Sequence, residues 1–133
     1  MKNNALELKF LAPHHFLYTQ DNFYSENQYE SICISILLND ATALVIVHEV
    51  KWCLTNPLSY MPLFPSPFFT FAFFPKCPPN VELTVLIAFC KYFLEHYPKY
   101  KAIYTKYFSK ETKQLLLEHG FKYYARDIIY YKQ

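Results

Sequence analysis

Glycine is almost absent from this chain, whose 133 residues include only one, Gly120. A chain of this length ordinarily carries about nine glycines, because glycine makes up roughly 7% of average sequences. Glycine-rich loops cradle phosphates because a backbone without side chains can approach them closely. The sequence therefore excludes a phosphate-binding loop of that kind.

Long apolar runs are missing as well. A membrane-spanning helix needs about 18 or more apolar residues in a row, and no segment of this chain reaches that length. The nearest one, Phe68–Phe74, is bounded by prolines and has the length of a buried strand. The first residues, MKNNALELKF, lack the apolar stretch of a signal peptide. We therefore expect a cytoplasmic protein that does not associate with membranes.

The cysteines do not show the spacing of a metal site. They are Cys33, Cys53, Cys77 and Cys90, so neither a C-x-x-C pair nor a zinc motif is present. Free and mostly buried thiols are the expected state. The adjacent His14 and His15 have two interpretations, a turn after Pro13 or part of a metal site, and the turn is favoured. We expect no metal ion.

Aromatic side chains are abundant instead. Aromatic residues account for 20% of the chain and hydrophobic residues for 53%. A disordered chain would be polar and poor in aromatics, so an ordered single domain over residues 1–133 is expected. Because Phe and Tyr bury large areas, the core should be aromatic. Aromatic surface left outside the core would suit a protein partner or a homodimer.

Charge is unevenly distributed along the chain. Residues 1–90 carry a net charge of −3 and residues 91–133 a net charge of +5. The basic part interleaves Lys with Tyr, as in YPKYKAIYTKYFSK, and such a pattern can bind single-stranded nucleic acid. A strand with one buried face produces the same interleaving, so we do not expect nucleic acid as a partner.

Apolar periodicity and turn residues predict the order of the elements. Ser31–Leu38 and Ala43–Trp52 form a hairpin around NDAT, because Asn and Asp favour turns. Ala43–Trp52 is apolar on both faces, which predicts a central strand covered by helices on both sides. The helix VELTVLIAFCKYFLEHY is capped by Asn80 and ends near Tyr97. The remaining predicted strands are Ala5–Ala12, Phe68–Phe74, Tyr100–Phe108 and a strand or hairpin in residues 121–132.

Gly120 stands where a second, shorter helix must end. That helix begins after Ser109, its predicted N-cap, and the residue that follows its C-terminal cap adopts a left-handed backbone that glycine tolerates best. Phe121 and Leu116 then occupy the two positions whose side chains pair in a Schellman cap. The single glycine is therefore predicted where a side chain would be most costly.

From residue 68 onward the order is strand, loop, long buried helix, strand, short helix ending in Gly-Phe, and closing strands. This order, with LLLEHGFKYYARD and IIYYK at its end, resembles the C-terminal half of the GNAT family of acyl-CoA N-acyltransferases. The resemblance implies an α/β (α+β) fold with a mixed, twisted sheet of about six to seven strands, splayed in the middle and flanked by helices. The 18 residues between the first two strands are short for the two helices usually found there.

The resemblance also implies acetyl-CoA or another acyl-CoA as cofactor. The cofactor would lie in the splay, and the loop PKCPPN would hold its pyrophosphate at the N-terminus of the long helix. The implied binding residues are Phe73, Phe74, Lys76, Cys77, Asn80, Val81 and Glu82. The family's loop carries glycines, whereas Pro78 and Pro79 here have no amide hydrogen. We therefore expect weakened binding, or a cofactor site that has been lost.

The implied catalytic residues are equally incomplete. In many family members a Tyr four residues before the Gly protonates the leaving thiolate, and that position here is Leu116, which cannot donate a proton. Tyr107 or Tyr104 could substitute. Glu49 and His48 are the nearest candidates for a general base. Because they are adjacent on a strand, they point to opposite faces and at most one can serve.

Each candidate also has a purely structural interpretation. His48, on an apolar face, fits a hydrogen-bonded core histidine, and Glu49 fits a local ion pair with Lys51. Cys77 beside Lys76 could be a reactive thiol, because a nearby cation lowers a thiol pKa. A plain loop cysteine is the favoured alternative.

Two functions therefore remain open. The first is a divergent acyltransferase that moves an acyl group from acyl-CoA to an amine. The second is a catalytically inactive protein of the same fold that binds or inhibits another protein, as phage-type anti-defence proteins do. The missing glycines, the Leu at the acid position and the surplus of aromatics favour the second.

Overall fold

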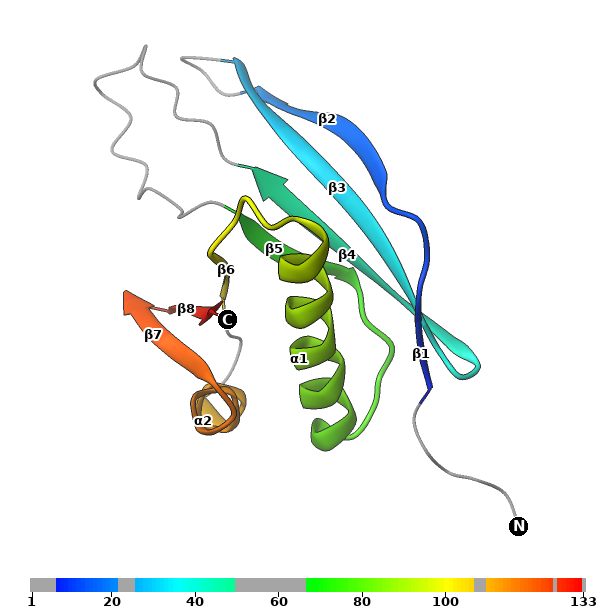
Figure 1. The fold of residues 1–133 in the computed structure, drawn as a ribbon, viewed down its shortest axis with the longest axis vertical. Coiled ribbons are helices and arrows are strands. Elements are labelled where there is room, and N and C mark those ends of the chain that lie inside the picture. The colour runs from blue at the N-terminus through cyan, green and yellow to red at the C-terminus, as the bar shows by residue number, and fades with distance from the viewer. Residues whose placement is uncertain (1–6, 22–25, 50–66, 107–109, 126, 133) are drawn as a thin grey trace.

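The computed structural model describes residues 7–21, 26–49, 67–106, 110–125 and 127–132 (Figure 1). They form one eight-stranded sheet and two helices, so the expected mixed α+β architecture is confirmed. The strands are β1 (Leu8–Phe10), β2 (His14–Asp21), β3 (Glu26–Leu38), β4 (Ala41–Glu49), β5 (Phe68–Phe73), β6 (Ala102–Lys106), β7 (Phe121–Ala125) and β8 (Ile128–Lys132). The helices are α1 (Pro79–His96) and α2 (Lys110–Glu118).

The sheet is antiparallel except at its centre. Its order is β1-β3-β4-β5-β6-β8-β7, with β2 also paired to β3. β5 and β6 pair in parallel at a single position, where Phe68 lies opposite Tyr104. The Tyr104 N–H donates to the Pro67 carbonyl at 3.0 Å, and the Thr105 hydroxyl donates to the Phe69 carbonyl at 2.9 Å. The two halves of the sheet are therefore joined only narrowly.

The prediction of six to seven strands was too low because of β2. The 18 residues between the first two predicted strands are short for the two helices of the GNAT family. In their described part they form β2 and the first part of β3. These strands pair from His14 opposite Cys33 to Asp21 opposite Glu26. The sequence HHFLYT contains the aromatic Phe16 and Tyr18 and the β-branched Thr19, residue types that fit a half-buried pleated surface better than a helix.

The core lies between the sheet and the two helices, and the aromatic contribution expected to it is present in large buried Phe side chains beside a greater number of Ile, Val and Leu. The buried residues of α1 are Val85, Leu86, Phe89, Cys90, Phe93 and Leu94. Phe89 is fully buried, with its ring centroid 4.9 Å from that of Phe69 on β5 and 6.1 Å from that of Phe93. Leu116 of α2 belongs to the same cluster. Both helices therefore cover the same face of the sheet (Figure 1).

The expectation that helices cover both faces of β4 was wrong for the part of the chain that the structure describes. Ala43, Val45 and Val47 are buried beneath α1, while Leu44 and Ile46 on the other face are only half-buried. The reason is topological. A helix that connects two parallel strands returns on one side of the sheet, and α1 connects β5 to β6 in this way.

The start of α1 also differs from the prediction. The helix begins at Pro79, with Pro78 in the N-cap position and no side-chain hydrogen bond at the cap. Proline suits the first helical position because its φ is already helical and its missing N–H is not needed there. The amides of Val81 and Glu82 donate to the Pro78 carbonyl at 3.0 and 3.1 Å. Asn80 is therefore inside the first turn and is not the cap.

The left-handed backbone expected at the only glycine is confirmed. Gly120 follows α2 with a φ of 101°. The His119 amide donates to the Leu116 carbonyl at 3.1 Å. Leu116 and Phe121, the pair expected to meet across the cap, are each 2% exposed and belong to the same core cluster.

Replacing Gly120 by Ala should destabilise the fold by about 1–2 kcal/mol, the cost of left-handed backbone in an L-residue. A Cβ at this position would have room, since its nearest neighbour is Tyr131 Cε2 at 3.7 Å. The cost should therefore be conformational rather than steric. Urea unfolding measures it, and Gly120→Asn should lose less, because Asn tolerates this conformation better. Equal losses for the two variants would contradict this explanation.

Candidate functional site

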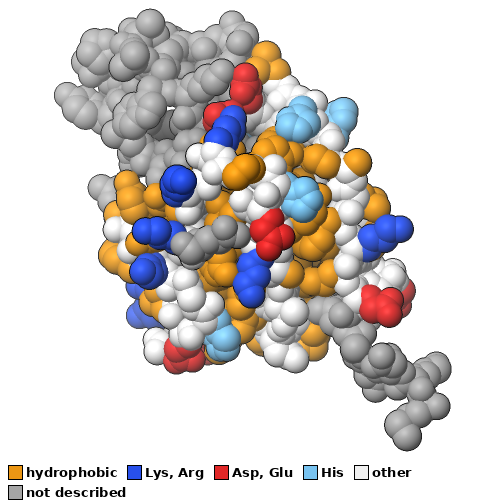
Figure 2. Space-filling model, viewed as in Figure 1, with side chains coloured by type: hydrophobic (Ala, Val, Ile, Leu, Met, Phe, Trp, Pro, Cys, Tyr) orange, Lys and Arg blue, Asp and Glu red, His pale blue; other side chains and the backbone are white. Residues whose placement is uncertain are grey.

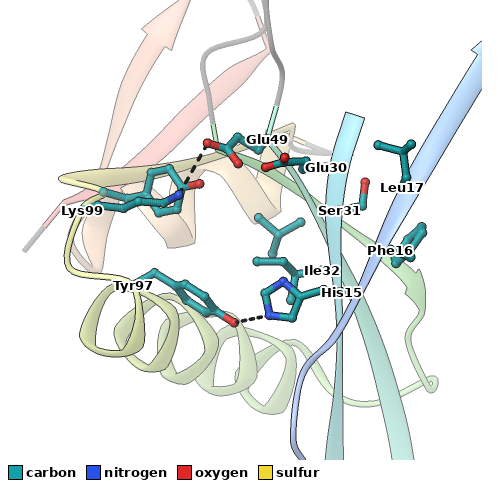
Figure 3. Close-up of a pocket in the computed structure, with 11 residues that line it drawn as sticks. His15, Phe16, Leu17, Glu30, Ser31, Ile32, Glu49, Tyr97 and Lys99 are labelled. Carbon is teal, nitrogen blue, oxygen red and sulfur yellow. Dashed lines mark hydrogen bonds and ion pairs between the residues drawn. The ribbon is translucent and has the colours of Figure 1, made fainter. Parts of the chain in front are cut away.

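A pocket of about 500 Å³ lies beside the C-terminal end of α1 (Figure 3). Its walls come from β2, β3, β4 and the turn after α1. The lining residues are His15, Phe16, Leu17, Glu30, Ser31, Ile32, Val47, Glu49, Tyr97, Lys99 and Tyr100. On the side of the molecule seen in Figure 2, acidic and basic side chains adjoin near the top, with hydrophobic and histidine side chains close by.

One extra residue in the edge strand turns part of β2 toward this pocket. Phe10 lies opposite Ile36 and His14 opposite Cys33, so three edge residues face two residues of β3. Such an insertion reverses which side chains point to which face. His15 consequently lies opposite Ile32 and lines the pocket on the α1 side of the sheet.

Two carboxylates stand side by side at the rim. Glu30 of β3 pairs directly with Glu49 of β4, and like charges in directly opposite positions repel. The Lys99 Nζ lies 3.7 Å from Glu49 Oε1 and 4.9 Å above the centre of the Tyr100 ring. The predicted partner of Glu49, Lys51, lies outside the described residues. The cation that the structure places at Glu49 is Lys99.

Two tyrosines form the α1 side of the pocket. The Tyr97 hydroxyl is 3.5 Å from His15 Nε2, at the long limit of a hydrogen bond. The Phe93 ring stacks on Tyr97 at 4.7 Å and on Tyr100 at 5.6 Å, which holds both tyrosines against the core. Burial is the main cause that raises the pKa of both phenols, so both remain neutral near pH 7. Each can therefore donate a hydrogen bond.

The residues expected to hold a cofactor lie at the opposite end of α1. They are Phe73, Phe74, Lys76, Cys77, Asn80, Val81 and Glu82. α1 spans 18 residues, or roughly 27 Å at a rise of about 1.5 Å per residue, and it carries Asn80, Val81 and Glu82 in its first turn, at the end away from Tyr97. On the sheet, Phe73 pairs with Leu44, five residues before Glu49 on β4. The structure thus brings the expected cofactor residues near one another but does not bring Glu49 to them.

A small groove between α1 and α2 lies beside the start of α1. The groove between α1 and α2 has a volume of about 10 Å³, which is close to the space of one water molecule. Its lining includes Glu82, Leu86 and Leu116. Burial, followed by the Glu82 carboxylate, raises the pKa of the Cys77 thiol. Cys77 therefore matches the interpretation as a plain cysteine and not as a reactive thiolate.

His48 matches its structural interpretation too. Its Nδ1 lies 2.8 Å from the Ser31 hydroxyl, and burial lowers its pKa below the ordinary 6.5. It lies on the face of β4 opposite to Glu49, as predicted from the strand alternation. Tyr107 lies outside the described residues.

The free energy of unfolding should decrease as the pH is lowered, because of His48. Above pH 6.5 its ring is neutral in both the folded and the unfolded chain, whereas below this value only the unfolded chain readily takes up the proton. Unfolding is therefore favoured as the pH falls from 6.5 toward the lowered folded-state pKa. Urea midpoints at about pH 7.5 and about pH 5 should differ more for the wild type than for His48→Gln. An equal pH dependence would refute the assignment.

A second feature is a cluster of three tyrosines on the sheet face away from α1. The rings of Tyr104 and Tyr124 are 5.2 Å apart, and those of Tyr104 and Tyr130 are 5.4 Å apart. Tyr124 is 47% exposed. The cluster supplies the aromatic surface that the composition predicts. A homodimer through it remains a prediction.

Sequence reasoning missed most of the pocket. Among the polar and aromatic lining residues, Glu30, Tyr97, Lys99 and Tyr100 were not singled out, and His15 was considered only for a turn or a metal site. One signal was available for Glu30. A two-residue turn at Asn39 and Asp40 sets the hairpin register and places Glu30 opposite Glu49. The N-terminal part of β3 was not predicted, so this register was not extended to Glu30.

Comparisons with protein-family models, with curated proteins and with solved structures return no match for this chain. Neither of the two helices described here has both the length and the apolar character needed to cross a membrane. Among the residues that the structure describes, no three or more His, Cys, Asp or Glu side chains gather as metal ligands would.

Proposed function

We propose that this protein binds a protein partner through the pocket at the C-terminal end of α1 and does not transfer acyl groups. The pocket itself carries the proposal, because its volume of about 500 Å³ lies within the range of small-ligand sites, roughly 300–1,000 Å³, and so has room for one side chain of a partner. It combines apolar walls with a few charged and hydroxyl groups, as binding sites do. Inhibition of the bound partner protein, as by phage-type anti-defence proteins, is one form of such binding.

The start of α1 argues against a pyrophosphate site. Anions bind at helix N-termini because unpaired amides point at them. Pro79 has no amide hydrogen, and the amides of Val81 and Glu82 are already bonded to Pro78. In this described turn, only the Asn80 N–H is left for an anion. The Glu82 carboxylate in the same turn would repel it.

Acyl transfer by a GNAT-like enzyme is the second candidate, and one observation favours it. The sheet is joined between β5 and β6 at one ladder position, and a sheet splayed in the middle is what membership of that family would imply. The order of elements from β5 to β8 also agrees with the resemblance. We infer that the chain has a GNAT-like fold in which the cofactor site has been lost.

Calorimetric titration with acetyl-CoA, alongside free CoA, separates the two candidates. The proposed binding role predicts no detectable heat at millimolar ligand. Micromolar binding would mean that the proline-containing loop still holds the cofactor, and the acyltransferase would then be preferred.

The partner itself can be sought by affinity purification from the source cells with three baits. The wild type and Phe73→Ala should enrich the same protein, because Phe73 is 56% exposed at the far end of α1. Tyr97→Ala should lose that protein, since Tyr97 lines the pocket. Equal recovery with all three baits would show that the pocket is not the binding site.

A further inference from the structure

We propose that the pocket recognises a single lysine or arginine side chain, whose charged head replaces Lys99 between Glu49 and Tyr100. This inference names the ligand of the binding site proposed above and rests on that proposal. The chemistry required is a cationic head group on an unbranched apolar stem of three or four carbons.

The structure already contains a cation in the proposed position. Lys99 Nζ is 3.7 Å from the Glu49 carboxylate and lies over the Tyr100 ring, 4.9 Å from its centre. An acidic group and an aromatic face together form a cradle for a cation, because the ring quadrupole and the carboxylate both attract positive charge. Lys99 therefore shows what kind of group this end of the pocket stabilises.

Lys99 can be displaced from this position by a competing cation. Its side chain is 65% exposed, and an exposed ion pair contributes little because water screens it. The turn after α1 carries Lys99, which lines the pocket together with Tyr97 and Tyr100. A ligand that enters with its stem against the walls can displace it.

The walls suit an aliphatic stem. Ile32 and Val47 lie on neighbouring strands in direct register and face the cavity, and Leu17 extends the apolar wall on β2. Leu17 is 57% exposed, so apolar surface remains to be covered at this position. The methylene groups of lysine and arginine commonly pack on such surfaces while the head group reaches a polar site.

The acidic side of the cradle favours a cation over a neutral group. Glu30 and Glu49 are direct cross-strand neighbours, and their repulsion falls when a positive charge lies beside them. The hydroxyls of Tyr97 and Tyr100 add polar contacts at the same rim. A neutral isostere of the ligand would fill the volume but would lack the positive charge that attracts the Glu49 carboxylate.

Titrations followed by amide-resolved NMR test the inference with blocked amino acids. The probes are Nα-acetyl-lysine methylamide, Nα-acetyl-arginine methylamide and, as the neutral isostere of the arginine probe, Nα-acetyl-citrulline methylamide. We expect saturable shifts at His15, Tyr97 and Tyr100 with the two charged probes and not with the neutral one. n-Butylamine distinguishes a free amine from a blocked residue, and tighter binding of n-butylamine would overturn the assignment to a protein side chain.

Two substitutions and a control variant sharpen the test. Glu49→Gln should weaken binding of the charged probes by about tenfold, since a charge-assisted contact is lost while the shape is kept. Lys99→Ala should tighten binding, because the resident competitor is removed. Lys101→Ala makes the same change in net charge at an exposed residue outside the pocket lining and should leave the affinity unchanged.

The outcomes separate this inference from the proposed function. Equal binding of charged and neutral probes, or equal effects of Lys99→Ala and Lys101→Ala, would overturn the cation cradle. Micromolar binding of acetyl-CoA would instead overturn the proposed function. Charge-dependent probe binding would support the cradle in either case.

Discussion

Replacing Phe89 by Ala should destabilise the protein by about 3–5 kcal/mol, the usual cost of removing a buried Phe side chain. Phe89 is fully buried at the centre of α1. Its ring lies 4.9 Å from that of Phe69, 6.5 Å from that of Phe71 and 6.1 Å from that of Phe93. Deleting it would leave a cavity between helix and sheet that rigid aromatic neighbours cannot fill.

Chemical denaturation measures this loss, which is a large part of the roughly 5–15 kcal/mol that stabilises a typical domain. Phe73→Ala is the matched control, because it removes the same side chain from a position that is 56% exposed. That variant should change stability by well under half as much. Comparable losses for both variants would mean that the core is not centred on α1.

Replacing Thr105 by Val should cost about 1–3 kcal/mol, because it leaves a buried carbonyl without its donor. Thr105 is 7% exposed, and its hydroxyl donates to the Phe69 carbonyl at 2.9 Å. This bond follows the only ladder pair between β5 and β6, Phe68 opposite Tyr104. A side chain thus connects the two halves of the sheet where the backbone ladder stops.

Thr105→Ser supplies the control for this prediction, because it keeps the hydroxyl and removes only a methyl group. Urea unfolding should show a smaller loss for Ser than for Val, although Val has nearly the shape of Thr. If Val were as stable as the wild type, the hydroxyl would not contribute to the junction between β5 and β6.

The local features of the fold were largely predictable from the sequence. The turn at Asn39 was expected from Asn-Asp, and Asn39 has a φ of 51°. The positive φ of Gly120 and the end of α1 at His96, before Pro98, agree with the predictions. Each of these depends on the backbone preferences of a few consecutive residues. Such preferences act whatever the rest of the chain does.

The predictions that failed concern choices between local alternatives. Asn80 is a good N-cap, yet Pro78 and Pro79 start the helix earlier, because proline favours the first turn as strongly. Residues 14–21 have no helical period, and their pairing with the long strand β3 makes them a strand. β3 itself begins at Glu26, before the predicted Ser31, because β2 continues to pair with it.

The sequence by itself determined where the chain turns, where its helices end and that its core contains large aromatic side chains, since these follow from neighbouring residues and composition. Only the tertiary structure decided which side chains meet. His15 and Tyr97 line one pocket although 82 residues separate them, and one extra residue before β2 turns His15 toward that pocket. The same structure places Glu49 near the C-terminal end of α1, whereas Asn80, Val81 and Glu82 of the expected cofactor site lie at its N-terminal end. Contacts of this kind depend on register and helix placement, which no short segment specifies.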